Sequence, residues 1–390
     1  MKPTQGNHTK IKRFEIFQDQ KNLTKYLEDN FTESLKQMIK VTIKTLVKSE
    51  MEEFRQQLED KEYFNGYYNR NLISSYGKFE DIPVPRFRKS QQGLQLNTLN
   101  IFDQEQGKFM QLIEQMHLLG ISQRKIKQLV NTCFGFSVGT KQIGKVYEEL
   151  INKEEYQINS KPINDTFEYI LFDGIWEKVK GYGWSNNQKV LLCALGIRPN
   201  GNREIIGFKL MPNEDGESWC TLLKDLKDRG LKTDSVKLII GDGHAGLKGA
   251  LNKYFSNTPF QSCIVHKMRN TIGKTSSKNK AIIARDLHVV FESKSKEDVE
   301  NNSKSFVKKW YMIEPKAIES FRFNLEDCFT YFSFEQENWT KIRTTNILER
   351  EFREVRRRFR VFDNTFQSEE SANKYANGIF SYLNSNYPLK

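Results

Sequence analysis

Two apolar runs in the sequence end in the same way, at an aspartate that is followed by glycine. Residues 167–174 read FEYILFDG and residues 236–243 read VKLIIGDG. Short apolar runs that are rich in branched side chains and bounded by glycine are typical of buried strands. A carboxylate at the end of a buried strand needs solvent, a hydrogen-bond partner or a bound cation. Asp173 and Asp242 therefore restrict the chain to folds that leave both strand ends open to a ligand or to water.

The segments around these runs predict an α/β domain in the order β-β-β-α-β-α-β. The first three strands are expected to form an antiparallel meander. The first and fourth strands should then lie side by side, which brings Asp173 and Asp242 together. Besides the two runs, the predicted elements are strands at 189–197, 203–211 and 260–266 and helices at 216–230 and 244–255.

Asp242 has three interpretations at this stage. Residues 241–246, GDGHAG, match the glycine pattern of a dinucleotide-binding turn. That turn normally follows the first strand, however, and an acid is expected at the next strand end, where CIVH stands instead. Asp242 is also suited to cap the helix that follows it. With Asp173 beside it, the two carboxylates suit a hard divalent cation such as Mg²⁺.

A third carboxylate is expected on the helix predicted at 344–360, TTNILEREFREVRRRFR. Its apolar residues recur every three or four positions and form one face, with Glu349 beside that face. A glutamate at the start of a basic helix would complete a two-metal site for phosphoryl transfer. The alternative is a capping box at residues 346–349, and Glu351 and Glu354 are rival acids.

The charge of the chain favours a polyanionic partner. The sequence has 61 Lys and Arg against 49 Asp and Glu, a net charge of +12. Nucleic acid is the first expectation, although a lysine-rich surface without a partner gives the same total. Residues 341–360 hold eight basic residues against three acidic ones. Seven of these are arginines, which form bidentate contacts with phosphate.

Residues 120–150 predict two short amphipathic helices that flank the turn FGFSVG. Ile126, Leu129 and Val130 would form the apolar face of the first helix. This spacing is that of a helix-turn-helix, for which an ordinary helical hairpin is the alternative. In a helix-turn-helix, the polar side chains that face DNA would be Thr140, Lys141, Gln142 and Lys145.

The sequence favours a reducing compartment and gives no sign of a membrane. No run approaches the roughly 18 apolar residues of a membrane span, and the N-terminus lacks the apolar core of a signal peptide. The five cysteines are scattered along the chain, which argues against a disulfide framework. Cys263 and His266 have the spacing of half a zinc site, but His244, His288 and Cys328 show no paired spacing. A structural or DNA-positioning role for Cys263 and His266 is the alternative.

Carboxylates on the first strand, the fourth strand and a later helix of a β-β-β-α-β-α-β-α core resemble the ribonuclease H-like arrangement. The chain as a whole resembles the Mutator-like transposases of bacterial insertion sequences, a family of DDE transposases. The family often has alanine at Gly174 and serine at Gly241. The segments that carry the resemblance are FDGIW (172–176), GDGHAGLKGAL (241–251), CIVHKMRN (263–270) and TTNILEREFREVRRR (344–358), with NGYYNRNL (65–72), VPRFR (84–88) and GISQRKIKQL (120–129) in the N-terminal half.

The resemblance implies a transposase that binds terminal inverted repeats, cleaves DNA at element ends and catalyses strand transfer. Asp173, Asp242 and Glu349 would hold two Mg²⁺ ions, for which Mn²⁺ would substitute. The implied partners are double-stranded DNA with terminal inverted repeats and target DNA, in the bacterial cytoplasm at the nucleoid. Holding two element ends predicts a homodimer or a higher homo-oligomer. The alternatives are a non-catalytic DNA-binding protein derived from a transposase and a ribonuclease H-like nuclease without strand transfer.

Further residues are expected to contact DNA. Trp310 and Trp339 lie in a segment without strand pattern and could stack on an unpaired base, or pack in a helical core instead. The residues expected to contact phosphate are Lys267, Arg269 and Asn270 near the Cys-x-x-His spacing, and Arg353, Arg356, Arg357 and Arg360 along the glutamate helix.

The predicted domain organisation combines this core with an all-α insertion and a mainly helical N-terminal region that contains a small β-hairpin segment. Its parts are an N-terminal helical region (1–60), a small β segment (61–100), a helix-turn-helix-like DNA-binding domain (101–155), the first part of the catalytic core (160–275), an α-helical insertion (276–340), and the glutamate helix with a C-terminal helical tail (341–390).

Overall fold

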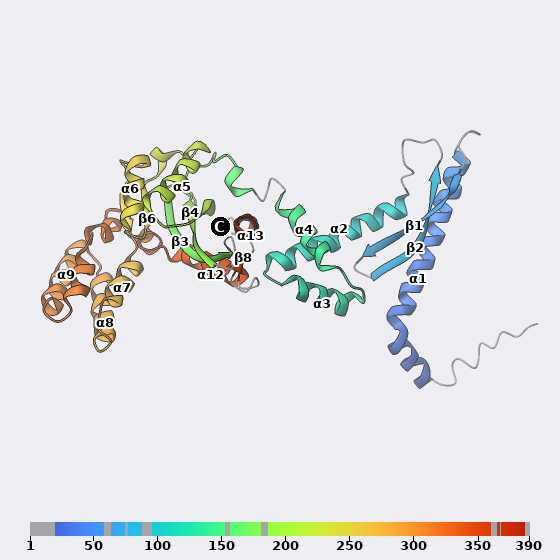
Figure 1. The fold of residues 1–390 in the computed structure, drawn as a ribbon, viewed down its shortest axis with the longest axis horizontal. Coiled ribbons are helices and arrows are strands. Elements are labelled where there is room, and N and C mark those ends of the chain that lie inside the picture. The colour runs from blue at the N-terminus through green and yellow to red at the C-terminus, as the bar shows by residue number, and fades with distance from the viewer. Residues whose placement is uncertain are drawn as a thin grey trace, which may run out of the picture. The chain divides into compact units, whose positions relative to one another are not determined.

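The computed structural model of the protein divides into two compact units (Figure 1). The first consists of Met1–Gln115 and Arg124–Ile143, and the second of Met116–Gln123 and Gly144–Lys390. The residues that the structure describes are 20–57, 64–74, 77–87, 96–152, 157–180, 186–359, 365–366 and 368–386.

The first unit is built on a long helix and a two-stranded sheet. Helix α1 (Gln20–Gln57) contains neither proline nor glycine, and β1 (Phe64–Ser74) pairs antiparallel with β2 (Gly77–Phe87). Ile43 and Val47 of α1 pack with Phe79 and Ile82 of the hairpin in one buried cluster. The predictions of an N-terminal helix and of a hairpin in residues 61–100 are confirmed.

Three helices follow the hairpin: α2 (Asn97–Leu118), α3 (Gln123–Phe134) and α4 (Thr140–Ile151). Ile126 and Val130 of α3 are fully buried, as predicted, but Leu129 is 38% exposed. The buried face of α3 is therefore narrower than the sequence pattern suggested. Gly135 ends α3 with a φ of +66°, the left-handed conformation that glycine adopts readily after a helix. Two short helices around a tight turn are confirmed at the level of secondary structure.

A mixed sheet forms the centre of the second unit, with the strand order β5-β4-β3-β6-β7. Its first three strands are antiparallel neighbours, as predicted, and β6 and β7 run parallel to β3. A short strand that was not predicted, β8 (Thr365–Phe366), pairs with the far end of β3. The bounds are Tyr169–Lys180 for β3, Asn186–Ile197 for β4, Arg203–Met211 for β5, Leu238–Gly241 for β6 and Phe260–Ser262 for β7.

Helices cover both faces of this sheet, because alternate residues of its strands are apolar on both sides. Ile170 and Phe172 of β3 pack in the cluster that includes the apolar residues of α5 (Gly216–Asp228) and α6 (Ala245–Tyr254). Leu171 and Ile175 belong to the opposite cluster, which includes α12 (Asn346–Phe359) and α13 (Glu369–Asn386). Since side chains alternate along a strand, Asp173 projects towards the face that α12 covers.

The fifth strand is shorter than predicted. It ends at Ser262, and helix α7 (Ile264–Gly273) begins two residues later, so that His266 is helical. Further helices then follow, as the sequence indicated for this segment. They are α8 (Lys280–Phe291), α9 (Lys296–Trp310), α10 (Pro315–Arg322) and α11 (Trp339–Ile342), with three 3₁₀ turns between α10 and α11.

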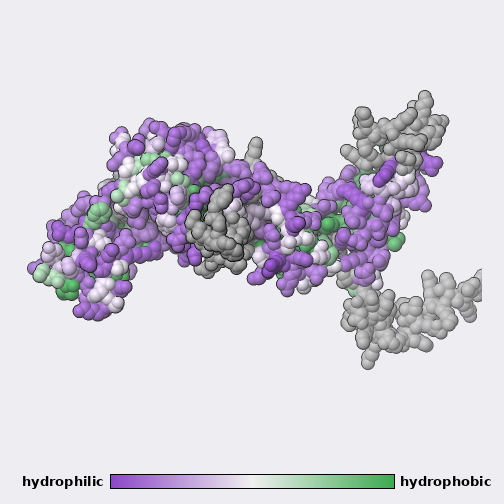
Figure 2. Space-filling view, viewed as in Figure 1, coloured by the Kyte–Doolittle hydropathy of each residue, from purple (hydrophilic) through white to green (hydrophobic). Residues whose placement is uncertain are grey.

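The visible surface is mostly hydrophilic, with hydrophobic residues gathered at the outer end of this helical segment (Figure 2). Tyr311, Met312 and Ile313, which follow α9, are 53%, 86% and 56% exposed. None of the helices in the described ranges combines the length and the apolar character that crossing a bilayer requires.

The N-termini of α5 and α6 approach each other closely because two glycines face each other. A Cβ atom on Gly246 would lie 2.8 Å from the backbone nitrogen of Gly216, closer than real Cβ contacts. Gly249, one turn later on α6, has no such neighbour within 4 Å. The contact places the loop before α5 beside the loop between β6 and α6.

This pair of glycines gives a matched test. Gly246→Ala should lower the free energy of unfolding by about 1–3 kcal/mol, because two backbones would have to separate. Gly249→Ala should be neutral or raise it by up to about 1 kcal/mol, since alanine favours the helix and meets open space. Chemical denaturation of both variants checks this, and equal effects at the two positions would contradict the close approach.

Candidate active site

Asp173 lies inside β3, which continues to Lys180, so the predicted strand end at this residue is wrong. It is the most buried of the predicted site residues that carry a carboxylate. Its side chain is only 8% exposed, and one oxygen accepts a hydrogen bond from the Gly174 backbone N–H at 2.8 Å. Gly174 is needed next to it, since a Cβ there would lie 2.9 Å from Cγ2 of Val190. Val190 of β4 therefore packs directly against this stretch of β3.

Glu349 reaches the same place from the first turn of α12. Its two oxygens accept hydrogen bonds from Nη1 and Nη2 of Arg269, at 2.8 and 3.0 Å. His266 Nε2 lies 3.5 Å from Oε1 of Glu349. The Asn346 N–H donates to the hydroxyl of Thr344, and the Glu349 N–H to the carbonyl of Thr345, so the capping-box interpretation of residues 346–349 is wrong. The rival acids Glu351 and Glu354 are not at this position, and Glu354 instead pairs with arginines of its own helix.

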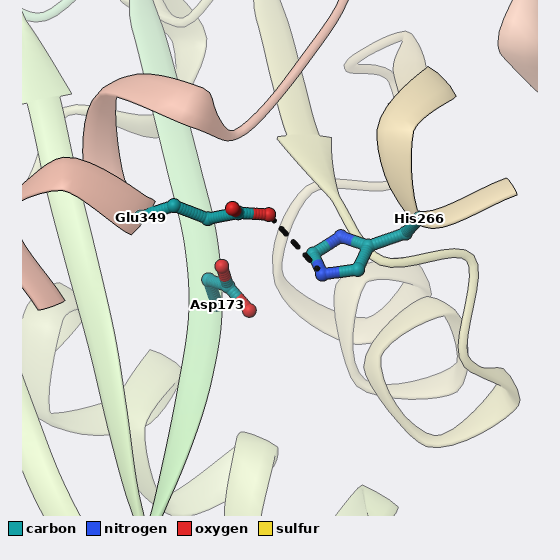
Figure 3. A group of neighbouring side chains, drawn as sticks. All are labelled: Asp173, His266 and Glu349. Atoms are coloured by element: carbon teal, nitrogen blue, oxygen red, sulfur yellow. Dashed lines mark ion pairs between the residues drawn. The ribbon is translucent and has the colours of Figure 1, made fainter. Parts of the chain in front are cut away.

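Asp173, His266 and Glu349 form one cluster (Figure 3). Each offers one ligand atom, and these atoms lie within 4.8 Å of one another. Among the described residues, this is the one group of three or more His, Cys, Asp or Glu side chains with such spacing. The structure thus brings together two of the three predicted carboxylates, contributed by a strand and by a helix that are far apart in the sequence.

The electrostatics of the cluster reflect two carboxylates close together in a dry environment. Burial raises the pKa of Asp173 to about 7, and the nearby Glu349 and Glu214 act in the same direction, while His266 opposes them. Burial alone would lower the pKa of His266, but Cys263, Asp173 and Asp242 more than compensate, and that pKa is raised to about 9. The imidazole therefore carries a positive charge that partly replaces the solvation of the carboxylates.

Asp242 follows β6, the strand paired with β3 on the side of β7. It is half-buried and does not belong to the cluster of ligand atoms within 4.8 Å, but it is close enough to raise the pKa of His266. The helix-capping interpretation is wrong, because His244 caps α6 by accepting the Gly246 N–H. Asp242 instead lines a cavity of about 740 Å³, together with His244, Cys263 and Lys267.

Cys263 and His266 lie together at the start of α7. Cys263 is buried at the N-terminus of α7, and its sulfur accepts hydrogen bonds from the backbone N–H and the hydroxyl of Thr345, both at 3.3 Å. Burial would raise the pKa of this thiol, but His266 and Thr345 lower it, and the net direction is down. The Ile264 N–H also donates to the carbonyl of Arg343 at 3.1 Å. These contacts join the start of α7 to the start of α12 and so set the distance between His266 and Glu349.

Several residues predicted to contact DNA lie at the surface, and others have partners within the protein. Lys267 donates to the backbone carbonyls of Ser320 and Phe323, and Arg269 is bound to Glu349. Arg357 pairs with Glu354. The exposed members of the predicted set include Lys141, Gln142, Lys145, Asn270, Arg353 and Arg356, Thr140 is half-buried, and Arg360 lies outside the described residues.

The two tryptophans considered for base stacking lie in the helical core. Trp310 is 4% exposed, and its Nε1 donates to Asp286 at 2.6 Å. Trp339 packs edge-on against Phe332 and donates to the carbonyl of Phe334. The packing alternative is therefore correct for Trp310, and Trp339 is half-buried against the same core.

Glu214 is a site neighbour that the sequence analysis missed. It precedes α5 in the segment NEDGESW, and its next residue, Asp215, caps that helix by accepting the Ser218 N–H. Burial raises the pKa of Glu214, and Asp242 acts in the same direction, whereas His244 and His266 lower it. The signal in the sequence that could have identified Glu214 is that it is a second acid directly before Asp215, the residue that caps α5.

Comparisons with known proteins agree on one family. The sequence model described as "Transposase, Mutator family" matches residues 6–388. The chain is 26% identical over 342 residues to the transposase for insertion sequence element ISRM5 of Rhizobium meliloti (strain 1021), covering 85% of this chain and 84% of that protein. It is 28% identical over 327 residues to the transposase for insertion sequence element IS256 in transposon Tn4001 of Staphylococcus aureus, covering 82% and 80%.

The raised pKa of Asp173 predicts a pH-dependent effect of Asp173→Asn on the metal-free protein. Below about pH 4 Asp173 is protonated in both the folded and the unfolded chain, so the variant should match the wild type. Between about pH 4 and pH 7 the unfolded chain gives up this proton while the folded chain keeps it, so the wild type loses stability over this range. At pH 8 the variant should therefore be more stable, by at most a few kcal/mol, since one pKa unit corresponds to about 1.4 kcal/mol.

Urea unfolding in a chelating buffer at pH 4 and pH 8 measures this difference. Asp234→Asn, at an exposed position of the same unit, serves as the control and should leave the pH profile unchanged. A variant of Asp173 that is less stable than the wild type at pH 8 would contradict the assignment of a destabilising buried charge.

Proposed function

The chain belongs to the Mutator family of transposases, and on this premise we propose that it cleaves and joins DNA strands at a centre formed by Asp173, Asp242 and Glu349. The observation that carries the proposal is the meeting of Asp173 and Glu349, which come from a central strand and a distant helix. Asp242 follows the strand next to that of Asp173. We further propose that the mixed sheet is a ribonuclease H-like core.

The donor set suits hard divalent cations, because carboxylate oxygens are the ligands that Mg²⁺ and Mn²⁺ prefer. Asp173 is buried with one hydrogen bond among the described residues, which leaves lone pairs available to a cation. Asp173, Asp242 and Glu349 would hold two Mg²⁺ ions, whose chemistry would be to activate a water or a 3′-hydroxyl for in-line attack and to stabilise the leaving oxygen.

The protein residues around the centre have roles of their own in this proposal. Arg269 and His266 balance the charge of Glu349. When Glu349 binds a metal ion instead, these two side chains would be released to contact the scissile phosphate. Asn270 and Arg353, both exposed, would hold the flanking backbone of the DNA. Thr345 and Cys263 keep α7 and α12 together and so orient His266 towards Glu349.

The N-terminal helices are proposed to bind the terminal inverted repeats. Lys141, Gln142 and Lys145 are exposed along α4, as the second helix of a helix-turn-helix requires. The homodimer or higher homo-oligomer expected from two element ends stays a prediction, which the mass of the protein–DNA complex would test. The exposed apolar residues after α9 are available for such a contact.

The first functional prediction concerns the three carboxylates. Asp173→Ala, Asp242→Ala and Glu349→Ala should each reduce Mg²⁺-dependent cleavage of element-end DNA at least about a thousandfold, with DNA binding nearly unchanged. Glu354→Ala is the control on the same helix and should retain activity. A strand-cleavage assay with labelled element ends measures the effect.

The same assay distinguishes the alternatives. A wild-type protein that binds ends without cutting them would support a non-catalytic DNA-binding protein. Cleavage without joined products would support a nuclease that lacks strand transfer. Normal cleavage by Glu349→Ala would show that the third carboxylate has been assigned to the wrong residue.

The second functional prediction concerns α4. In the full-length protein, Lys141→Ala with Gln142→Ala should weaken binding to element ends by about 1–3 kcal/mol and reduce the preference for ends over random DNA. Wild-type affinity should fall steeply as the salt concentration rises. Fluorescence anisotropy with both DNA types at several salt concentrations tests this. Equal wild-type affinity for end and random DNA throughout would refute the helix-turn-helix assignment.

A further inference from the structure

Glu214 occupies a position that its local structure does not require. The neighbouring Asp215 already caps α5, so the N-terminus of this helix has its acceptor without Glu214. The side chain of Glu214 is half-buried rather than pointing into solvent. Within the described part of the chain, no lysine or arginine forms an ion pair with it. A partly buried carboxylate without a cationic side chain costs stability unless something else compensates its charge.

Close backbone contacts hold Glu214 near Asp173 and Asp242. The Gly216–Gly246 contact joins the start of α5 to the start of α6, only a few residues after Asp242 and His244. A Cβ atom built on Gly174 would lie 3.5 Å from the carboxyl carbon of Glu214, so this carboxylate lies against the residue that follows Asp173. Glu214 is thereby fixed beside the middle of β3, next to Gly174, and close to the start of α6.

Glu214 is surrounded by residues of the candidate active site. Asp242, His244 and His266 all act on its charge, and the side chain of Trp176 on β3 hydrogen-bonds to it. Glu214 also acts on the charge of Asp173, which is more than nine-tenths buried and has one hydrogen bond among the described residues. An acid placed among acids, with histidines but no lysine or arginine beside it, is the arrangement expected where a cation binds.

We propose that Glu214 is a fourth carboxylate of the divalent-cation site, acting on the side of Asp173 and Asp242 away from Glu349. This inference rests on the proposed function, since it assumes that the three carboxylates bind cations. Three carboxylates leave the four positive charges of two divalent ions incompletely balanced, and Glu214 supplies the missing negative charge. Glu214 would thus touch the cation directly or through one bound water.

Cation binding to the full-length protein, without DNA, tests the proposal independently of activity. Isothermal titration with Mn²⁺ should show binding to the wild type that Glu214→Gln weakens at least about tenfold. Glu217→Gln, at an exposed position in the first turn of the same helix, should bind like the wild type. In the absence of cations, Glu214→Gln should be at least as stable as the wild type, which shows that the variant folds.

Trp176 provides a second readout that locates the ion. Tb³⁺ bound beside Glu214 should give emission when tryptophan is excited, and this emission should be largely lost in Trp176→Phe. Mn²⁺ titration of Trp176→Phe checks that the site itself remains. Loss of the emission with retained Mn²⁺ binding supports a cation next to Glu214.

Two results would overturn the proposal, and they differ in their meaning. If the wild type binds Mn²⁺, Asp173→Asn abolishes binding and Glu214→Gln binds like the wild type, Glu214 is not a ligand while the proposed function stands. If the wild type shows no Mn²⁺ binding even at millimolar concentrations, both the fourth carboxylate and the three-carboxylate cation site are wrong.

Discussion

The burial of the Asp173 carboxyl at the centre of a mixed sheet is the constraint on which the rest of the second unit depends. A strand that carries an acid in its interior can be stable only if neighbouring groups compensate the charge. Here β4 closes one side against Gly174, and His266, Arg269 and Glu349 gather on the other. The strands, α7 and α12 are thus arranged around one side chain that contributes little to the stability of the hydrophobic core.

In this structure, positively charged side chains of the protein compensate the charge of the carboxylates. Arg269 donates to both oxygens of Glu349, and a ring nitrogen of His266 lies within 4.8 Å of both carboxylates. Such an arrangement lets the protein fold before a ligand arrives, since the charges are already paired. The pairs are also partly exposed, with the side chain of Arg269 57% exposed, so that they can be exchanged for other partners at modest cost.

Much of the fold could be predicted from the sequence, because the strands of the second unit are apolar on both faces. The end of β3 could not, since the strand continues to Lys180, past the end predicted at Asp173. The neighbouring positions of β3 and β6 followed from the order of the elements, and Glu349 followed from the apolar period of its helix. The early end of β7 could not be predicted, because FQSCIVH has the same composition as a strand. Glu214 was missed because its environment is created by the Gly216–Gly246 contact, which no local pattern reveals.

The junction between α7 and α12 has a consequence for the segment that separates them. Ile264 is hydrogen-bonded to Arg343, and Cys263 to Thr345. Residues 264–343 therefore begin and end at the same place beside the sheet. A chain segment whose two ends are fastened together can change in length at little entropic cost, about 0.6 kcal/mol for each doubling. The distance between the carboxylates therefore does not depend on the length of residues 264–343. Helices could be added to this segment or removed from it without changing the orientation of Glu349.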